Sequence, residues 1–146
     1  MENKTINRTE LLMKITVGDV MHKDVITIDF DDLVAKASRL MMEHRLHSLL
    51  VLKYGKPAYM LSTYDLLKLS YENAFNESNI DMLKTQVEEL VKGQKLITVR
   101  TETPLLEALQ TLVEYNIHSL PVIDDNVVMG LLTLMDLARW YKSTHE

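Results

Sequence analysis

The residues of this sequence with the clearest chemical potential are two pairs of a hydroxyl and a carboxylate with the same spacing. Ser62 precedes Asp65 by three residues, and Thr133 precedes Asp136 in the same way. A carboxylate offers two acceptor oxygens at the spacing of a vicinal diol. A hydroxyl at a helix N-terminus lies where free N–H groups and the positive end of the helix dipole favour a phosphate. Such a turn can bind a ribose phosphate.

The same spacing also has a purely structural interpretation. Ser/Thr-x-x-Asp is an acidic relative of the capping box, in which the two side chains satisfy backbone N–H groups at the start of a helix and need no ligand. Both interpretations stay open for each motif. The paired context, with an apolar strand before each motif at the same offset, favours ligand binding.

The two motifs belong to an internal repeat with an offset of 71 residues. Between residues 26–67 and 97–138 no gap is needed, and about ten of roughly forty aligned positions are identical, where unrelated composition would give about two or three. The matched segments include Leu46-His47-Ser48-Leu49 with Ile117-His118-Ser119-Leu120. The chain therefore contains a duplication, and its two copies should share one architecture.

Each copy has the pattern of a β-α-β-β-α unit, which predicts an α+β fold. A short apolar stretch (25–28 and 96–99) predicts a strand, and apolar residues at helical spacing then predict a helix. In the second copy, Thr103 is the predicted N-cap and Pro104 the first helical residue. Two β-rich runs follow, joined by connectors with hairpin chemistry. A further helix opens after Ser62 and after Thr133.

The remaining segments are not duplicated. The polar N-terminal arm is expected to pack as a short helix through Leu11, Leu12 and Ile15. In the linker, apolar residues at helical spacing follow Ser78 and Asp81, which form a possible capping box, so a linker helix is predicted. The predicted divisions are the arm (1–15), the first repeat (16–70), the linker with its helix (71–91) and the second repeat with a C-terminal helix (92–146).

Composition narrows the classes of function. Sixteen basic and 21 acidic residues give a formal charge of −5, which provides no long-range attraction to nucleic acid or anionic lipid. The absence of Cys excludes disulfides and thiolate nucleophiles, and no His-x-x-x-His or nearby carboxylate set predicts a metal site. The apolar runs are far shorter than the ~20 residues of a membrane span, and the polar N-terminus lacks a secretory signal. We therefore expect a cytoplasmic protein without membrane contact.

An ordered set of motifs, present twice, resembles the cystathionine-β-synthase (CBS) domain. In copy one the set runs Asp19-Val20-Met21, Ile26-Thr27-Ile28, Leu46-His47-Ser48-Leu49-Leu50-Val51, Ser62-x-x-Asp65. In copy two it includes Ile117-His118-Ser119-Leu120-Pro121-Val122 and Gly130-Leu131-Leu132-Thr133-x-x-Asp136. The resemblance covers residues 16–142, and the tandem arrangement is similar to the CBS pair called a Bateman module. It implies two repeats packed about a pseudo-twofold axis, with two related clefts for an adenine nucleotide or an adenosyl compound.

The resemblance also implies roles for individual residues. In the family, the Asp of this motif holds the ribose hydroxyls and the Ser/Thr contacts ribose or phosphate. This assigns Asp65 with Ser62 to one cleft, and Asp136 with Thr133 to the other. The short first strands, which flank the adenine, would contribute Ile26, Thr27 and Ile28 and, in the second copy, Ile97, Thr98 and Val99. The strand 26–28 is expected to close the cleft that uses Asp136.

Two equivalent histidines, His47 and His118, fall at a position that the resemblance places near the phosphates. An imidazolium there would help to bind an anion. The structural alternative is a hydrogen bond from the ring to a backbone carbonyl. The other histidines, His22, His44 and His145, offer less.

The first copy departs from the family pattern at two positions. Leu50 stands where copy two has Pro121, and Tyr59 stands where copy two has Gly130. A glycine lets a ligand or a backbone segment approach closely, whereas a tyrosine could fill part of the cleft or stack on a base. We therefore expect the cleft that uses Asp136 to bind adenosine nucleotides more tightly than the cleft that uses Asp65.

The sequence predicts a regulatory module that binds AMP, ADP, ATP or an S-adenosylmethionine-type ligand in the clefts between two CBS repeats and signals by a change in conformation or stability. No cofactor is required. The alternative is a ligand-free dimerisation or partner-docking module, in which Asp65 and Asp136 only cap helices. No nucleophile has a matched base and no phosphate-cradling Gly-Lys-Ser/Thr loop occurs, so an enzyme is not predicted. Nucleic-acid binding has examples in the family but is opposed by the acidic balance.

Partners follow from the same features. The helices after the two motifs carry apolar residues with few neighbours to bury them in so small a chain, which predicts a homodimer. These residues are Leu66, Leu67, Leu137, Trp140 and Tyr141. Trp140 is the expected interface residue, with packing against the N-terminal arm as its alternative. An unidentified effector protein, or a self-associated copy, is expected to read the ligand-dependent geometry.

Overall fold

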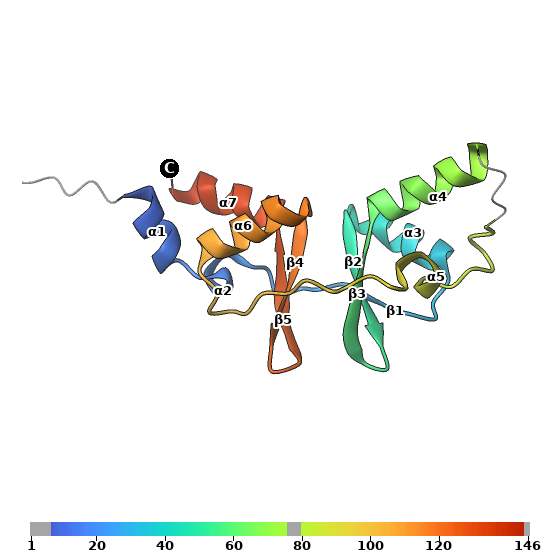
Figure 1. Cartoon of the computed structure of the whole chain (residues 1–146), viewed down its shortest axis with the longest axis horizontal. Coiled ribbons are helices and arrows are strands. Elements are labelled where there is room, and N and C mark those ends of the chain that lie inside the picture. The colour runs from blue at the N-terminus through green and yellow to red at the C-terminus, as the bar shows by residue number, and fades with distance from the viewer. Residues whose placement is uncertain (1–6, 76–79, 145–146) are drawn as a thin grey trace, which may run out of the picture. The chain divides into compact units, whose positions relative to one another are not determined.

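A computed structural model describes residues 7–75 and 80–144 of the chain (Figure 1). Helices and strands are mixed, as the sequence predicts, and both repeats are present. The elements in chain order are α1 (Arg8–Lys14), α2 (Val17–Val20), β1 (Thr27–Asp29), α3 (Val34–His44), β2 (Ser48–Lys53), β3 (Lys56–Ser62), α4 (Thr63–Phe75), α5 (Glu88–Val91), α6 (Leu105–Tyr115), β4 (Ser119–Asp124), β5 (Val127–Thr133) and α7 (Leu134–Thr144).

The chain divides into two compact units. Each unit contains one repeat together with the segment that directly precedes the other repeat in the sequence. The first-repeat unit is residues 26–96, which includes the linker segment 80–96. The second-repeat unit joins residues 97–144 to the N-terminal segment 7–25. Residues 16–25, which the sequence pattern assigns to the first repeat, thus pack with the second repeat.

The two hairpins have the same register at the repeat offset of 71 residues. Ser48 pairs with Ser62 in β2–β3, and Ser119 pairs with Thr133 in β4–β5. Each hairpin has a register shift at the matching place, after Val51 and after Val122. Both turns have two central residues with positive φ, Tyr54-Gly55 and Asp125-Asn126, which matches the right-handed twist of the strands. The duplication therefore extends to backbone geometry.

The first strand differs between the repeats. In the first repeat, β1 pairs in parallel with β2 along three residues, Thr27 to Asp29. In the second repeat, the predicted strand 96–99 is reduced to a single parallel bridge between Val99 and Val122, which corrects the sequence prediction. The Val99 N–H donates to Pro121 O, and its carbonyl accepts from Ile123 N–H. Val99 is therefore held beside β4 by two backbone hydrogen bonds, although no regular strand forms there.

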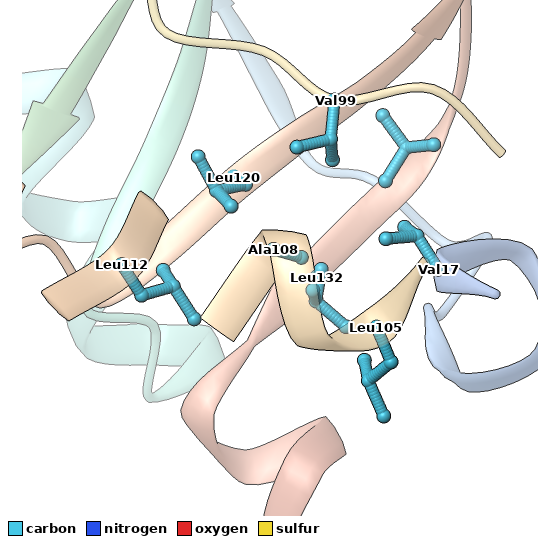
Figure 2. Packing of buried hydrophobic residues seen from close by; sticks show 8 residues of the cluster. Val17, Val99, Leu105, Ala108, Leu112, Leu120 and Leu132 are labelled. Atoms are coloured by element: carbon cyan, nitrogen blue, oxygen red, sulfur yellow. The ribbon is translucent and has the colours of Figure 1, made fainter. Parts of the chain in front are cut away.

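Each unit has its own hydrophobic core. The first core contains Ile28 of β1, Ala37 and Met41 of α3, and residues of the β2–β3 hairpin, and it is completed by Val87 and Val91 of the linker segment. Figure 2 shows the second core, in which Leu105, Ala108 and Leu112 of α6 pack on Leu120 and Leu132 of the β4–β5 hairpin. Val17 of the N-terminal segment is fully buried there. Both cores therefore use apolar side chains that lie outside the duplicated residues.

The start of α6 corrects a second prediction. The N-cap is Pro104, with an extended ψ of 140°, and the helix begins at Leu105. Pro104 forms an antiparallel bridge with Thr16, and the Leu105 N–H donates to Ile15 O. The Thr103 hydroxyl instead accepts from Arg100 N–H at 3.0 Å. The N-terminal segment therefore holds Pro104 in an extended conformation and delays the helix by one residue.

The two unduplicated segments form short helices. The arm forms α1, and Leu12 and Ile15 pack at the edge of the second core as expected. The linker helix is a single turn, α5, because residues 81–84 form turns in which the Asp81 carboxylate accepts from Leu83 N–H. Ser78, the other half of the predicted capping box, lies outside the described residues. None of the helices in the described ranges is long and apolar enough to cross a membrane.

Candidate functional site

The Thr133–Asp136 turn joins the end of β5 to the first turn of α7. Asp136 Oδ2 accepts from the Thr133 N–H at 2.8 Å and from the Thr133 hydroxyl at 3.0 Å. The Asp136 N–H in turn donates to Thr133 Oγ1 at 3.2 Å. This reciprocal pattern is a capping box with aspartate in place of glutamate. The structural interpretation of the motif is therefore realised, and the carboxylate is held in one orientation.

The Asp136 carboxylate has two further partners that the motif does not include. Its side chain is 4% exposed, and His22 Nδ1 lies 2.8 Å from Oδ2. The other oxygen, Oδ1, has a long contact of 3.4 Å with Arg139 Nη1, whose side chain is 70% exposed. The neighbours of the two oxygens thus differ: Oδ2 is surrounded by three donors, whereas Oδ1 has one weak contact.

His22 reaches this site from the N-terminal segment, 114 residues away in the chain. Its backbone forms an antiparallel bridge with Leu131 of β5. The two N–H···O hydrogen bonds of this bridge have nitrogen-to-oxygen distances of 3.1 and 2.9 Å. Sequence reasoning missed this residue, because no local motif contains it. The signal that could have found it is its place directly after Asp19-Val20-Met21, within the matched family pattern.

The equivalent turn of the first repeat has the same capping box, and its carboxylate has no further side-chain partner within residues 7–75 and 80–144. Asp65 Oδ2 accepts from the Ser62 N–H at 2.8 Å and from the Ser62 hydroxyl at 3.1 Å, and the Asp65 N–H lies 3.3 Å from Ser62 Oγ. At the repeat offset, Gly93 takes the place of His22. The two carboxylates therefore have the same local geometry and different surroundings.

The close approach of His22 explains Gly130. A Cβ at this position would lie 2.5 Å from His22 O and 2.8 Å from Met21 Sδ. Glycine is thus required by the N-terminal backbone, the second of the two reasons that the sequence suggested. In the first repeat, Tyr59 occupies the matching position, and the neighbouring Met60 N–H donates to the Gln94 side chain. There a side-chain contact replaces the backbone bridge.

The two predicted phosphate histidines are exposed and adjoin the motif helices. The carbonyl of His47 accepts from the Thr63 N–H at 2.9 Å, and the carbonyl of His118 accepts from the Leu134 N–H at 3.1 Å. Each backbone therefore satisfies the first N–H group after its Ser/Thr. Both rings lie at the surface close to a helix N-terminus, where an anion is favoured.

The first-strand residues are divided between core and surface. Ile28 is 3% exposed and Val99 is 7% exposed, and each belongs to the core of its own unit. Ile26 and Ile97 are half-buried at the edges of those cores, whereas Thr27 and Thr98 are exposed. A ligand beside either segment would thus meet backbone and threonine rather than the central apolar side chains.

No group of three or more His, Cys, Asp or Glu residues that could hold a metal ion occurs among residues 7–75 and 80–144. His22 and Asp136 are a pair without a third such ligand. The chemistry available at the turn is therefore hydrogen bonding through a carboxylate and a hydroxyl beside a helix N-terminus.

The sequence profile of the CBS domain matches residues 17–72 and 87–143, so this chain belongs to the CBS domain family and contains two CBS domains. Among curated relatives, the CBS domain-containing protein YhcV of Bacillus subtilis is 27% identical over 124 residues, covering 84% of this chain and 83% of its own. The mitochondrial CBS domain-containing protein CBSX3 of Arabidopsis thaliana is 28% identical over 141 residues, covering 90% of this chain and 66% of its own.

Solved structures have the same fold. The CBS domain structure NE2398 is 27% identical, with a TM-score of 0.77, and the match covers 88% of this chain and 98% of that one. CBSX2, solved in complex with AMP, is 28% identical, with a TM-score of 0.75, and the match covers 90% and 99% of the two chains. Several relatives are longer: an uncharacterized protein of Methanocaldococcus jannaschii is 25% identical, and the match covers 91% of this chain but 33% of that protein.

Proposed function

We propose that this chain is a regulatory module that binds adenosine-containing ligands, such as AMP, ADP, ATP or S-adenosylmethionine, at the Ser/Thr-x-x-Asp turns of its two CBS domains. The observation that carries the proposal is the Thr133–Asp136 turn, where a fixed carboxylate and a hydroxyl begin an eleven-residue helix. His118 and the exposed Thr27 and Thr98 are the further residues proposed to contact ligand.

The turn supplies the contacts that a ribose phosphate needs. Asp136 Oδ1 has spare acceptor capacity for a ribose hydroxyl, because a carboxylate oxygen has two lone pairs and, among the described residues, this one has only the 3.4 Å Arg139 contact. The helix N-terminus and a donor N–H of the His118 ring favour the phosphate. The capping box and ligand binding are compatible, since capping uses Oδ2.

The relatives support an adenosine ligand. CBSX2, which shares 28% of its residues with this chain over nearly the whole of both chains, was solved with AMP. The Asp136 turn is the stronger candidate in this chain because its carboxylate is buried and held by partners from two segments. Asp65 with Ser62, together with His47 of the same repeat, is proposed as the weaker site.

The first experiment is to purify the protein, denature it and analyse the supernatant for retained nucleotide by mass spectrometry. Calorimetric titration of nucleotide-free protein with AMP, ADP, ATP and S-adenosylmethionine then gives affinities. We expect at least one ligand to bind, and adenosine-free phosphates to bind more weakly. Absence of binding by all four ligands, in protein shown to be folded by circular dichroism, rejects the proposal.

Signalling is proposed to follow from linkage. A ligand that binds the folded module stabilises the arrangement it fits, and a free concentration of 100 times Kd adds about 2.7 kcal/mol to the free energy of unfolding. An unidentified effector protein or a second copy of the chain would respond to the stabilised state. The module itself is proposed to bind and not to catalyse.

The alternative function is a ligand-free dimerisation or partner-docking module. Two observations favour it: both carboxylates already cap helices, and α4 carries exposed apolar side chains at helical spacing. These are Tyr64, Leu67, Tyr71 and Phe75, each between 58% and 72% exposed. The nucleotide titration separates the two functions, since a docking module would bind none of the four ligands.

A further inference from the structure

We infer that His22 is the positioning residue of the second-repeat site: its Nδ1–H holds Oδ2 of Asp136, so that Oδ1 is presented to the ligand. This role rests on the proposed function and adds to it His22, which lies outside the motif residues that the resemblance assigns to ligand binding. The hydrogen bonds that carry it lie within the second-repeat unit.

The hydrogen-bonding capacity of Asp136 Oδ2 is filled. This oxygen accepts from the Thr133 N–H at 2.8 Å, the Thr133 hydroxyl at 3.0 Å and His22 Nδ1 at 2.8 Å. Three donors leave it no room for a ribose hydroxyl. Ligand binding at Asp136 must therefore use Oδ1, and the orientation of the carboxylate about its own axis decides whether Oδ1 is available.

The ring hydrogen of His22 that faces Asp136 is on Nδ1. An ionised carboxylate accepts hydrogen bonds and cannot donate them, so the nitrogen that contacts it must carry hydrogen. The neutral form of His22 is therefore the Nδ1–H tautomer. A charge-assisted bond of this kind is about twice as strong as a neutral one and resists rotation of the carboxylate. The charged groups at the pair are Asp136 itself and Arg139 from α7, with Lys23 and Asp24 next in the chain.

The backbone of His22 keeps its ring in place. The His22 backbone is bonded twice to Leu131, and Gly130 leaves the space that this approach requires. The ring is 35% exposed, whereas the carboxylate it contacts is 4% exposed. The imidazole is therefore anchored through its own backbone beside a buried carboxylate. Gly130 is needed for this backbone approach, which a loose surface contact would not require.

Among the described residues, the two repeats make the same capping bonds and differ in the further partners of the carboxylate, of which His22 is the close one at 2.8 Å. Asp65 makes the same capping bonds to Ser62, but Gly93 lies at the position of His22. The Asp65 carboxylate is therefore held by its capping box without a third donor. This provides a physical reason for unequal affinities of the two sites.

The test uses three substitutions that separate the two ring nitrogens. His22→Asn keeps a donor close to the position of Nδ1, His22→Gln keeps a polar group close to the position of Nε2, and His22→Ala keeps neither. We expect AMP affinity, measured by calorimetry, to fall about tenfold in the Ala and Gln variants and to be largely restored in Asn; tenfold corresponds to about 1.4 kcal/mol. His44→Ala, an exposed histidine at the end of α3, is the control and should bind as the wild type does.

A measurement without ligand tests the same contact. The ¹⁵N spectrum of the His22 ring above pH 7 should show the Nδ1–H tautomer, and Asp136→Ala should abolish that preference. An Nε2–H tautomer in the wild type overturns the inference. So does wild-type AMP affinity in His22→Ala, or restoration by Gln and not by Asn, which would mean direct contact through Nε2.

Failure of the inference and failure of the proposed function are distinguishable. If the wild type binds none of the adenosine ligands, the function fails and the positioning role falls with it. If the wild type binds AMP and His22→Ala binds equally well, only the role of His22 fails.

Discussion

Asp65 and Asp136 occupy the same place in their repeats and accept different numbers of hydrogen bonds. The donors to Asp65 come from Ser62, whereas Asp136 also accepts from His22 and Arg139. Both carboxylates cap a helix, so replacing either one should reduce stability. Their contributions to ligand binding should differ, and this allows capping and binding to be separated by experiment.

We expect Asp136→Ala to weaken AMP binding by one to two orders of magnitude, since the loss of a charged hydrogen-bond acceptor in a buried site costs about 1.5–3 kcal/mol. Asp65→Ala should change the measured affinity less. Calorimetric titration of each variant gives the comparison. Asn at each position retains capping ability and is the control for lost stability. Normal AMP binding by Asp136→Ala, together with a lower Tm, would mean that Asp136 is a capping residue alone.

A second prediction at this scale concerns His118. If its ring contacts a phosphate, His118→Ala should weaken AMP binding by up to about fivefold, the range of an exposed charged contact. Calorimetric titration of the variant beside the wild type measures the change, and His44→Ala is the control. An affinity that the substitution leaves unchanged would assign His118 to its structural role.

The residues of the motif turns could be predicted from the sequence because the contacts within them are local. Ser62 and Asp65, like Thr133 and Asp136, are three residues apart and meet at the start of one helix. His22 could not be predicted in this way, because its contact with Asp136 depends on the chain returning to the second repeat across 114 residues. A single sequence carries no periodicity that encodes such a contact.

At the scale of elements, the two hairpins differ at one repeat position, which carries a basic residue, Lys53, in the first repeat and an acidic residue, Asp124, in the second. Each residue holds its hairpin to a neighbouring segment of the same unit. In the first repeat, Lys53 contacts Glu88 at 2.7 Å and lies over the Phe30 ring; this hydrogen bond to Glu88 raises the pKa of Lys53. In the second repeat, the matching residue is Asp124, which accepts from the Thr101 hydroxyl at 2.6 Å and from the Thr101 N–H at 3.0 Å. The hydrogen bonds from Thr101, followed by the charge of Arg100, lower the pKa of Asp124.

This difference predicts an acid-sensitive contact in the second repeat. Because the folded-state pKa of Asp124 lies below its ordinary value of 3.8, its contribution to stability is present above that value and is lost as the pH falls through the lowered pKa. Asp124→Asn should therefore be less stable than the wild type at pH 7, and the difference in Tm should shrink below about pH 4. Thermal melts from pH 3 to 7 measure it.

Asp125→Asn is the matched control, since Asp125 is 91% exposed and has only a 3.8 Å contact with Arg100. Its Tm should follow the wild-type curve. A gap between Asp124→Asn and the wild type that stays constant down to pH 3 would contradict the linkage.

Elements with a local signal were predicted closely, and those that depend on a distant segment were not. The hairpins follow from β-rich runs and turn residues, and α3 and α6 follow from their apolar periodicity. The start of α6 was displaced by Thr16, and the strand 96–99 was reduced to one bridge at Val99. For α6, the deciding partner came from another part of the chain.

At the scale of the whole molecule, we predict a homodimer. Leu66, Leu137 and Trp140 are partly buried and pack against the cores of their own units. This weighs against Trp140 as the main interface residue. The exposed apolar surface on α4 is the remaining candidate for a dimer interface. Leu67 is 68% exposed, and the ring centroids of Tyr71 and Phe75 lie 4.9 Å apart.

Sedimentation equilibrium at micromolar concentration should show a dimer, and Leu67→Glu should shift it toward the monomer because a carboxylate cannot be buried unpaired in an apolar interface. Val127→Glu, on an exposed residue at the β4–β5 turn, is the control and should leave the mass unchanged. A monomeric wild type would remove the prediction.

The exchange of segments between the units sets an order for folding during synthesis. The first-repeat unit is one continuous stretch of chain, so it is complete and can fold before residues 97–146 have been synthesised. Val17, by contrast, is translated early and finds its partners only after Leu105, Leu120 and Leu132 have emerged. A fragment of residues 26–96 should therefore fold alone, whereas 97–146 should need a peptide of residues 1–25 supplied separately; circular dichroism of the two fragments, with and without the peptide, tests this. The N-terminal segment, although first to be made, is then among the last to find its place.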